Sequence, residues 1–326
     1  MQGPVDGVES VLHGKKGFCM NAFIGHARDE HLRRAGTSGG VGSALLSHLF
    51  ATKRIGTSVS FSFEKSSLRY VPRLIHGFDE YVPTGSIYQD IDLIGFLRTH
   101  ADAMEGGFAC FCLPCQAVAI RNLIRRSGHD CILLGLVCSS QQTLEATECL
   151  LKLLHVGKND VESLRYRGEG WPGGIRIALK DGTRLFVENN GSVWTDIFHS
   201  RLCSPARCLY CRNTLNDYAD ISLADPWLPE FRKKAGNGDT LVVGRTELGM
   251  EILREAVAEC ALEPIGGDKM PLSQQATIRR KEGYAMHPGR RKWLRWLRKW
   301  NWYKKLVFSS SFTLKIHRKL LSRFKL

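Results

Sequence analysis

Two cysteines in the second half of the chain are spaced for metal or redox chemistry. Cys208 and Cys211 are separated by two residues, and a Cys-x-x-Cys pair puts two thiolates within reach of one metal or cluster. A four-thiolate site needs two more ligands. Cys115 follows Leu113-Pro114, and Cys138 ends an apolar run that begins at residue 131. We predict that Cys115, Cys138, Cys208 and Cys211 together hold one iron–sulfur cluster.

The elements that must position these cysteines alternate between strand and helix. Apolar runs predict strands over 108–113 and 131–137, and helical spacing follows each run, over 116–126 and 141–154. This alternation is typical of a parallel α/β core, in which functional groups lie at the carboxyl ends of the strands. Cys115 and Cys138 both follow such ends, so we expect them to lie close together.

The domain organisation follows from changes in composition along the chain. A Gly-rich stretch and a hairpin around Asp181-Gly182 predict a β-rich insertion after the α/β units. We predict a lead-in over residues 1–33, one domain over 34–289 and a basic tail over 290–326. The expected fold class is mixed α/β: a parallel-sheet α/β core with a β-rich insertion and a basic helical C-terminal tail.

A Gly/Ser-rich turn precedes a helix near the N-terminus. Thr37-Ser38-Gly39-Gly40 runs into a segment with an apolar face that includes Val41 and Leu45. Free amides at a helix start form an anion site, which suits a phosphate or a flavin edge. A capped helix that needs glycine for tight packing explains the pattern equally well.

Three charged residues are candidates for contact with a substrate. Arg165 and Arg167 lie on one face of a predicted strand, and two arginines of this kind suit a carboxylate or a phosphate. A solvated strand face accounts for them at least as well. Asp225 ends the predicted strand over 221–225. We assign Arg165, Arg167 and Asp225 as catalytic or substrate-contacting residues.

The net charge of +14 is concentrated in the tail. Residues 290–326 contain thirteen Lys or Arg and no Asp or Glu, which leaves +1 for residues 1–289. Four tryptophans, Trp293, Trp296, Trp300 and Trp302, are interleaved with these cations. Such a pattern favours a helix on an anionic membrane surface, while nucleic acid and a plain solvated helix are the alternatives. We do not expect nucleic acid as a partner, because the body is near neutral.

The sequence also indicates a compartment. No apolar run approaches the length of a membrane span, and the first residues lack a secretory pattern. The chain has eleven cysteines. Because disulfides are rare in a reducing compartment, we expect some of these cysteines to bind a metal or to take part in redox chemistry. We expect a cytoplasmic protein, peripheral on the inner face of the cell membrane.

Seven short motifs, none of them specific alone, occur in the order of a known family. They are Ser38-Gly39-Gly40 with Ser43-Ala44-Leu45-Leu46, Gly85-Ser86 with Tyr88, Leu113-Pro114-Cys115-Gln116, Gly135-Leu136-Val137-Cys138, Arg165-Tyr166-Arg167-Gly168 with Gly170-Trp171-Pro172-Gly173, Arg207-Cys208 with Cys211, and Ala219-Asp220-Ile221-Ser222 with Asp225. In these motifs the chain resembles the coenzyme F420 hydrogenase/dehydrogenase beta-subunit family.

The resemblance implies FAD, a 4Fe–4S cluster, and electron transfer from a ferredoxin-like donor to a small-molecule or lipid-linked acceptor. It places six residues at the flavin: Thr37, Ser38, Gly39, Gly40, Ser86 and Tyr88. The chain differs from the family in lacking an N-terminal ferredoxin-like segment, so one cluster is expected. Bacterial relatives imply a role in cell-surface polysaccharide metabolism.

Two other functions remain open at this stage. A non-catalytic electron-transfer subunit would use the same cofactors to supply a partner enzyme. A zinc-stabilised binding protein would use the same four cysteines, but would leave the Ser-Gly-Gly and Gly-Ser turns without a role. The sequence does not decide whether deazaflavin is used.

Overall fold

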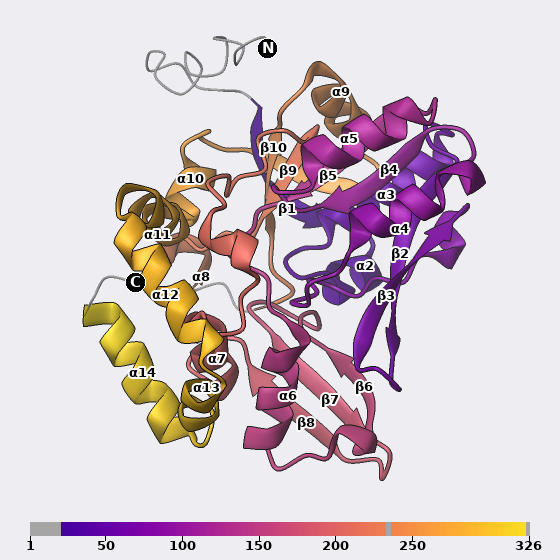
Figure 1. Ribbon diagram of the computed structural model, residues 1–326. Coiled ribbons are helices and arrows are strands. Elements are labelled where there is room, and N and C mark those ends of the chain that lie inside the picture. The colour runs from indigo at the N-terminus through magenta and orange to yellow at the C-terminus, as the bar shows by residue number, and fades with distance from the viewer. Residues whose placement is uncertain (1–20, 233–235, 324–326) are drawn as a thin grey trace.

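The computed structural model describes residues 21–232 and 236–323, and within them the strands form two sheets (Figure 1). The main sheet has the order β11-β1-β10-β9-β5-β4-β2-β3, and the small sheet has the order β6-β7-β8. The strands are β1 (Ala22–Ala27), β2 (Thr57–Glu64), β3 (Arg69–Ile75), β4 (Phe108–Cys112), β5 (Cys131–Leu136), β6 (Val161–Arg165), β7 (Gly174–Leu179), β8 (Arg184–Glu188), β9 (Ile221–Ala224), β10 (Thr240–Gly244) and β11 (Cys260–Pro264).

Helices surround both sheets. They are α2 (Glu30–Ala35), α3 (Val41–Ala51), α4 (Leu93–Thr99), α5 (Ala117–Arg126), α6 (Leu144–Leu153), α7 (Val193–Ser200), α8 (Pro229–Arg232), α9 (Glu247–Glu255), α10 (Lys269–Ser273), α11 (Gln275–Met286), α12 (Pro288–Lys299), α13 (Asn301–Val307) and α14 (Ser311–Arg323). Short 3₁₀ turns are η1 (Phe78–Glu80), η2 (Ala101–Ala103), η3 (Lys158–Asp160) and η4 (Ala206–Leu209).

Four neighbouring strands of the main sheet, β2, β4, β5 and β9, run parallel. Their carboxyl ends therefore meet at one edge, where the chain continues into Cys115 after β4, Cys138 after β5 and Asp225 after β9. This is the edge at which ligand sites of open α/β sheets form. The predicted mixed α/β fold class is confirmed.

Buried residues alternate between the two faces of these strands. Ala109 and Ile132 belong to the apolar cluster that includes α3 and α9. Their neighbours Phe108 and Leu133 belong to the cluster that includes α4 and α5. A parallel sheet covered on both faces explains why β4 and β5 read as continuous apolar runs in the sequence.

The small sheet and the C-terminal helices share one apolar core. Ile175 and Ile177 of β7 and Trp194 of α7 are fully buried there, together with Leu314 of α14. Helix α14 also bonds to α7 directly, since Arg318 pairs with Asp196. The helices of residues 290–323 therefore pack against the body of the protein (Figure 1).

The predicted lead-in contains one strand of the main sheet. Residues 1–20 of the predicted lead-in lie outside the described part of the chain. Residues 22–27 form β1, which pairs antiparallel with both β10 and β11 inside the main sheet.

Within the described ranges, no helix is both long and apolar enough to span a membrane.

Replacement of Leu314 tests whether α14 is part of the folded core. Leu314 is fully buried, so Leu314→Ala should lower the free energy of unfolding by about 2–5 kcal/mol, measured by urea denaturation. Leu320, on the same helix and 41% exposed, supplies the control: Leu320→Ala should change it by about 0.5 kcal/mol or less. Equal, small effects would mean that α14 is not packed on the body.

Candidate redox site

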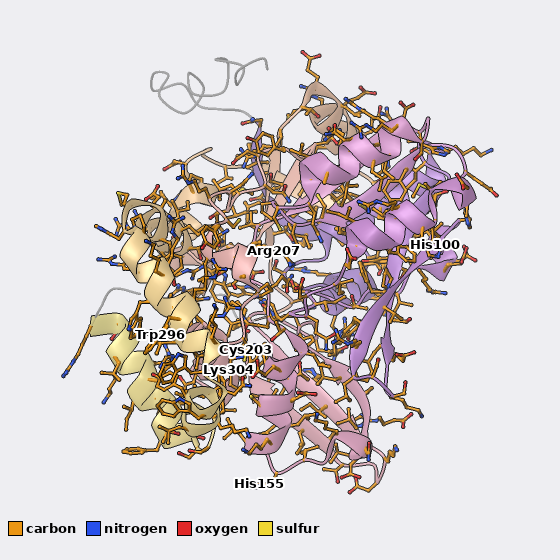
Figure 2. The ribbon with its side chains drawn as sticks, in the orientation of Figure 1. His100, His155, Cys203, Arg207, Trp296 and Lys304 are labelled. Carbon is orange, nitrogen blue, oxygen red and sulfur yellow. The ribbon has the colours of Figure 1, made fainter. Side chains whose placement is uncertain are left out.

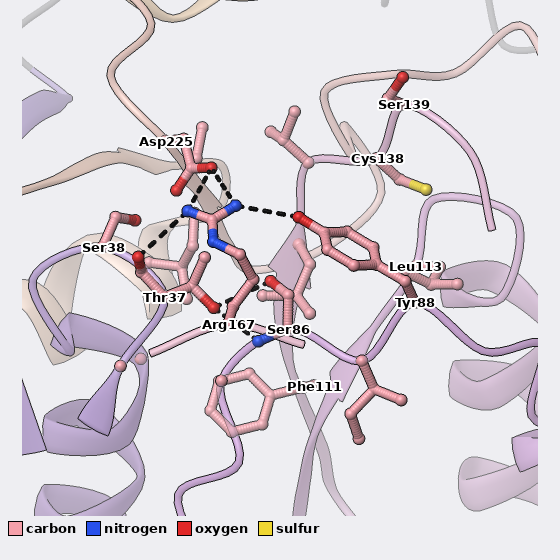
Figure 3. Close-up of a pocket in the computed structure, with 18 of the residues that line it drawn as sticks. Thr37, Ser38, Ser86, Tyr88, Phe111, Leu113, Cys138, Ser139, Arg167 and Asp225 are labelled. Carbon is pink, nitrogen blue, oxygen red and sulfur yellow. Dashed lines mark hydrogen bonds and ion pairs between the residues drawn. The ribbon is translucent and has the colours of Figure 1, made fainter. Parts of the chain in front are cut away.

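A cavity of about 780 Å³ opens where the carboxyl edge of the main sheet meets α7 and α11. Its size is that of a cofactor or substrate pocket. Predicted site residues from five separate segments line it (Figure 3). They are Thr37, Ser38, Gly40, Ser86, Tyr88, Cys138, Arg167 and Asp225.

The turn before α3 forms one wall of the cavity. Gly39 and Gly40 both have φ of +71°, a left-handed conformation that favours glycine. A Cβ on Gly40 would come within 2.3 Å of the Leu32 carbonyl oxygen. The backbone is thereby held so that the start of α3 faces the cavity, as an anion or flavin edge would require.

Two predicted flavin residues are bonded to each other across this wall. The Thr37 hydroxyl donates to the Ser86 hydroxyl at 2.9 Å, and the Ser86 amide donates to Thr37 Oγ1 at 2.6 Å. The loops that carry the Ser-Gly-Gly and Gly-Ser motifs are thus fixed relative to one another. The sequence separation of 49 residues gave no local sign of this pairing.

Arg167 occupies the centre of the site and is completely buried (Figure 3). Its guanidinium donates to Tyr88 Oη at 2.9 Å, to Asp225 Oδ2 at 3.2 Å and to the Thr37 carbonyl oxygen at 3.2 Å. Burial alone would lower the pKa of Arg167, but the Asp225 carboxylate and Tyr88 raise it above the ordinary value. Arg167 therefore remains charged and joins three segments of the cavity wall.

Arg165 is turned away from the cavity. It donates to the carbonyl oxygens of Pro83 at 2.8 Å, Thr84 at 3.2 Å and Arg167 at 2.9 Å, and also to that of Ala35. The structure places it outside the lining of the cavity. These bonds give Arg165 a role in holding loops together, and its substrate contact stays a prediction without support from the geometry.

The four predicted cluster ligands lie close enough together for their charges to interact, and Cys138 among them lines the cavity. Burial raises the pKa of Cys138 to about 12, Lys281 lowers it, and negative charge on Cys208, Cys115 or Cys211 raises it. Cys115 is likewise close enough to Cys211 and Cys208 for their charge to affect its pKa, which burial raises. The four thiols thus form one group drawn from three loops.

The group is wider than the ligand set of a single ion. In the described part of the chain, no three His, Cys, Asp or Glu side chains are arranged to hold one metal ion. A four-iron cluster binds each thiolate at a different iron, so its ligands stand further apart than those of one ion. The role of the four cysteines as cluster ligands stays a prediction.

Two cations of α11 are directed at this group. Lys281 is 4% exposed and donates to Cys211 Sγ at 3.5 Å and to the Cys138 carbonyl oxygen at 2.9 Å. Arg280 donates to the Ser139 carbonyl oxygen at 2.8 Å. Burial lowers the pKa of Arg280, and negative charge on Cys138, Cys208 or Cys211 would raise it.

Two more arginines lie beside the same thiols. Burial and the neighbouring Arg280 lower the pKa of Arg201 to about 9, and its Nη1 has no partner. Arg298 of α12 is close to Cys208, burial lowers its pKa, and its Nε has no partner. In the described residues, none of Arg201, Arg280, Lys281 and Arg298 forms an ion pair with a carboxylate.

This unbalanced positive charge fits an anionic centre. Buried cations are costly unless an opposite charge compensates them. Four thiolates with their cluster carry net negative charge and would supply it. Sequence reasoning missed Arg201, Arg280, Lys281 and Arg298. One available signal was α11 itself, which has few apolar residues, so a packed α11 must turn polar side chains inward.

Some residues that line the cavity carry buried polar atoms without hydrogen-bond partners. Trp171 is 7% exposed, lines the cavity and has no partner for its Nε1. Arg167 Nε and Gln141 Oε1, also in the lining, are unpartnered in the described structure. Unsatisfied buried polar atoms are rare in native proteins and call for a ligand or water.

Fold and site together define a class of protein: an α/β protein with four converging cysteines at the end of a ligand-sized cavity. Comparison with known families narrows this class. Residues 106–266 match the family described as the C terminus of the coenzyme F420 hydrogenase/dehydrogenase beta subunit. The family resemblance expected from the motifs is confirmed.

A solved structure shares the fold over most of the chain. It is titled a xenon derivatization of the F420-reducing [NiFe] hydrogenase complex from Methanosarcina barkeri. One of its chains aligns with a TM-score of 0.62 and 16% sequence identity, over 81% of this chain and 90% of that one. At this identity the likeness concerns the fold. Among curated proteins, none matches the chain.

The ion pair at the centre of the cavity should be costly to break. Asp225→Ala leaves the fully buried Arg167 without its carboxylate, so the free energy of unfolding should fall by about 3 kcal/mol or more. Asp217 forms a more exposed pair with Arg245, and Asp217→Ala should lower it by about 1 kcal/mol or less. Urea unfolding of both variants measures the difference, and similar small losses would contradict the central role of Arg167.

Proposed function

We propose that the chain is an iron–sulfur flavoprotein that transfers electrons between a one-electron donor and an organic acceptor. The group of four cysteines would hold a 4Fe–4S cluster, and the cavity would hold FAD. When bound, the cluster would carry single electrons and the flavin would combine them into two-electron chemistry. The observation that carries the proposal is that Cys138 belongs to the cysteine group and also lines the cavity.

The protein's own residues supply position and charge. Gly40, Thr37 and Ser86 shape the wall against which a flavin phosphate or ring edge would lie. Arg167 and Asp225 keep a fixed, paired charge beside it. Lys281 donates to Cys211 Sγ, so a cation lies beside one of the proposed ligands.

The donor and the acceptor are proposed from the family. A ferredoxin-like protein would supply single electrons, and the acceptor would be a small or lipid-linked molecule, in keeping with a role in cell-surface polysaccharide metabolism. The similar solved structure is of an F420-reducing complex, so reduction of a deazaflavin is a further candidate. Of these features, the cavity supports only the size of the acceptor site.

A second candidate is an electron-transfer subunit that serves a partner enzyme. The similar structure belongs to a hydrogenase complex, and the same cysteines and cavity would serve in such an assembly. Reduction of a soluble acceptor by the isolated chain would favour the enzyme. Turnover only with a partner protein present would favour the subunit.

Cysteine replacement tests the proposed function directly. Anaerobically purified protein should contain about four iron and four sulfide per chain, together with releasable FAD. Cys208→Ser and Cys211→Ser should each lose most of the iron, because each removes one thiolate. Cys260→Ser is the matched control, since Cys260 is buried in the apolar cluster near α9, and it should keep the full iron content.

Two outcomes of these assays would contradict the proposal. One is a colourless protein with one zinc per chain, which would leave the zinc-binding alternative. The other is iron that survives in both variants, which would place the cluster elsewhere.

We also propose that the C-terminal helices touch an anionic membrane surface. Trp296, Trp300 and Trp302 are 37–58% exposed, and the rings of Trp296 and Trp300 are 4.5 Å apart. Phe312 on α14 is 72% exposed. Exposed tryptophans beside lysines and arginines suit the interface of anionic lipids.

Vesicle binding tests this surface. Replacing Trp296 and Trp302 by serine should weaken co-sedimentation with phosphatidylglycerol-containing vesicles by about tenfold, because each ring contributes apolar area at the interface. Phe186→Ser, at a 54% exposed aromatic on β8, should leave binding unchanged. Wild-type protein that ignores the vesicles would contradict the proposal.

A further inference from the structure

An aromatic and basic surface covers the outer side of the Cys208–Cys211 turn. Tyr210 lies between the two cysteines in the sequence and is 49% exposed. The Arg291 guanidinium lies 5.0 Å from the centre of the Tyr210 ring. Arg295 Nη1 donates to Tyr210 Oη at 3.5 Å. Helix α12 therefore brings two cations onto the turn that carries two of the proposed cluster ligands.

The two flanks of α12 are chemically different. Leu294 and Leu297 are buried and fix the inner face of the helix. At 3.6 residues per turn, Arg291 and Arg295 fall on one flank, one turn apart, while Trp296 falls on the opposite side. The basic flank faces the cysteine turn, and the tryptophans point elsewhere.

The surface is fixed relative to the cysteines by a small apolar cluster. Leu209, which lies between Cys208 and Cys211, is buried against Tyr284 of α11, Leu294 of α12 and Leu321 of α14. The basic side chains of α12 are therefore held in place beside the turn.

Positive charge at this surface has little to offset it. Arg207 and Arg212, which flank the two cysteines, are both exposed, and Arg207 is labelled in Figure 2. Asp90 pairs with Arg207, so this carboxylate and this guanidinium cancel. Arg212, Arg291 and Arg295 remain, and the chain has no Asp or Glu after residue 282.

We infer that this surface docks an acidic one-electron carrier protein that delivers electrons to the cysteine-bound centre. We call it the basic collar, and it consists of Arg207, Tyr210, Arg212, Arg291 and Arg295. The inference rests on the proposed function and names where its donor binds. In each encounter one electron leaves the reduced carrier, which is oxidised, and reduces the centre; no covalent bond changes. Two encounters supply the electron pair that a hydride acceptor takes.

An acidic protein fits the basic collar better than a lipid surface does. Complementary charge steers a carrier to the one place where its electron has the shortest route. Trp296, one of the interfacial tryptophans that a membrane would use, lies on the other flank of α12. Cys115, another proposed ligand, is exposed and lies near Arg207 of the collar.

Charge reversal at two sites separates these partners. Arg291→Glu with Arg295→Glu should slow reduction by an acidic 2Fe–2S ferredoxin by about tenfold or more at about 50 mM salt. The difference from wild type should vanish at about 0.5 M salt, where screening removes steering. Lys305→Glu with Lys319→Glu makes the same change in net charge at exposed sites outside the collar, and this control should be reduced at the wild-type rate.

Iron content, reduction by dithionite and vesicle binding are measured on the same variants. Iron content and reduction by dithionite should be equal in all variants, which shows that the centre itself is intact. An equal loss in both double variants would overturn the inference in favour of general charge, and an unchanged ferredoxin rate in the collar variant would overturn it outright. Loss of vesicle binding alone in the collar variant would reassign the surface to a membrane. Wild-type protein without iron would instead overturn the proposed function.

Discussion

Uncompensated positive charge in the interior is the constraint around which the site is arranged. Arg201, Arg280 and Lys281 are largely removed from water beside the cysteines, and no carboxylate in the described structure pairs with them. Proteins rarely bury cations in this way without an anion. Four thiolates would supply this negative charge most directly, because the four cysteines lie beside the cations and would bind a negatively charged cluster.

The fold explains how distant segments reach this one place. The parallel register of β4 and β5 brings Cys115 and Cys138 to one edge of the main sheet. Helix α7 begins with a capping box at Ser192, and its C-cap, Arg201, has a left-handed conformation. The chain then leads to Cys208 and Cys211. The C-terminal helices then cover this turn through Leu209. Cys138 lines the cavity, and Arg167 forms hydrogen bonds to three segments of the cavity wall.

Continuous apolar runs in the sequence were enough to predict the core strands and the edge they share. The runs over 108–113 and 131–137 became β4 and β5, because strands buried on both faces leave an uninterrupted apolar record. Placement of Cys115 and Cys138 followed from the same rule. Arg165 and Arg167 could not be distinguished in this way, because both sit near the end of one strand and only long-range packing decides which guanidinium enters the cavity.

Local sequence patterns could not predict the buried cations near the cysteines or the packing of the tail against the body. Arg280 and Lys281 lie about 70 residues after the cysteines that they approach, and no spacing rule joins them. The tail was predicted as a surface helix from its charge and its tryptophans. Its buried residues, among them Leu294 and Leu314, are a sparse minority, and their contacts depend on α7 and α11, which the tail sequence does not reveal.

Anomalous X-ray diffraction at the iron absorption edge, on crystals of anaerobically purified protein, tests the central claim most directly. The account predicts one compact iron signal bounded by Cys115, Cys138, Cys208 and Cys211, with Lys281 and Arg280 beside it. An anomalous signal at the zinc edge in that position, or iron bound at other residues, would contradict it.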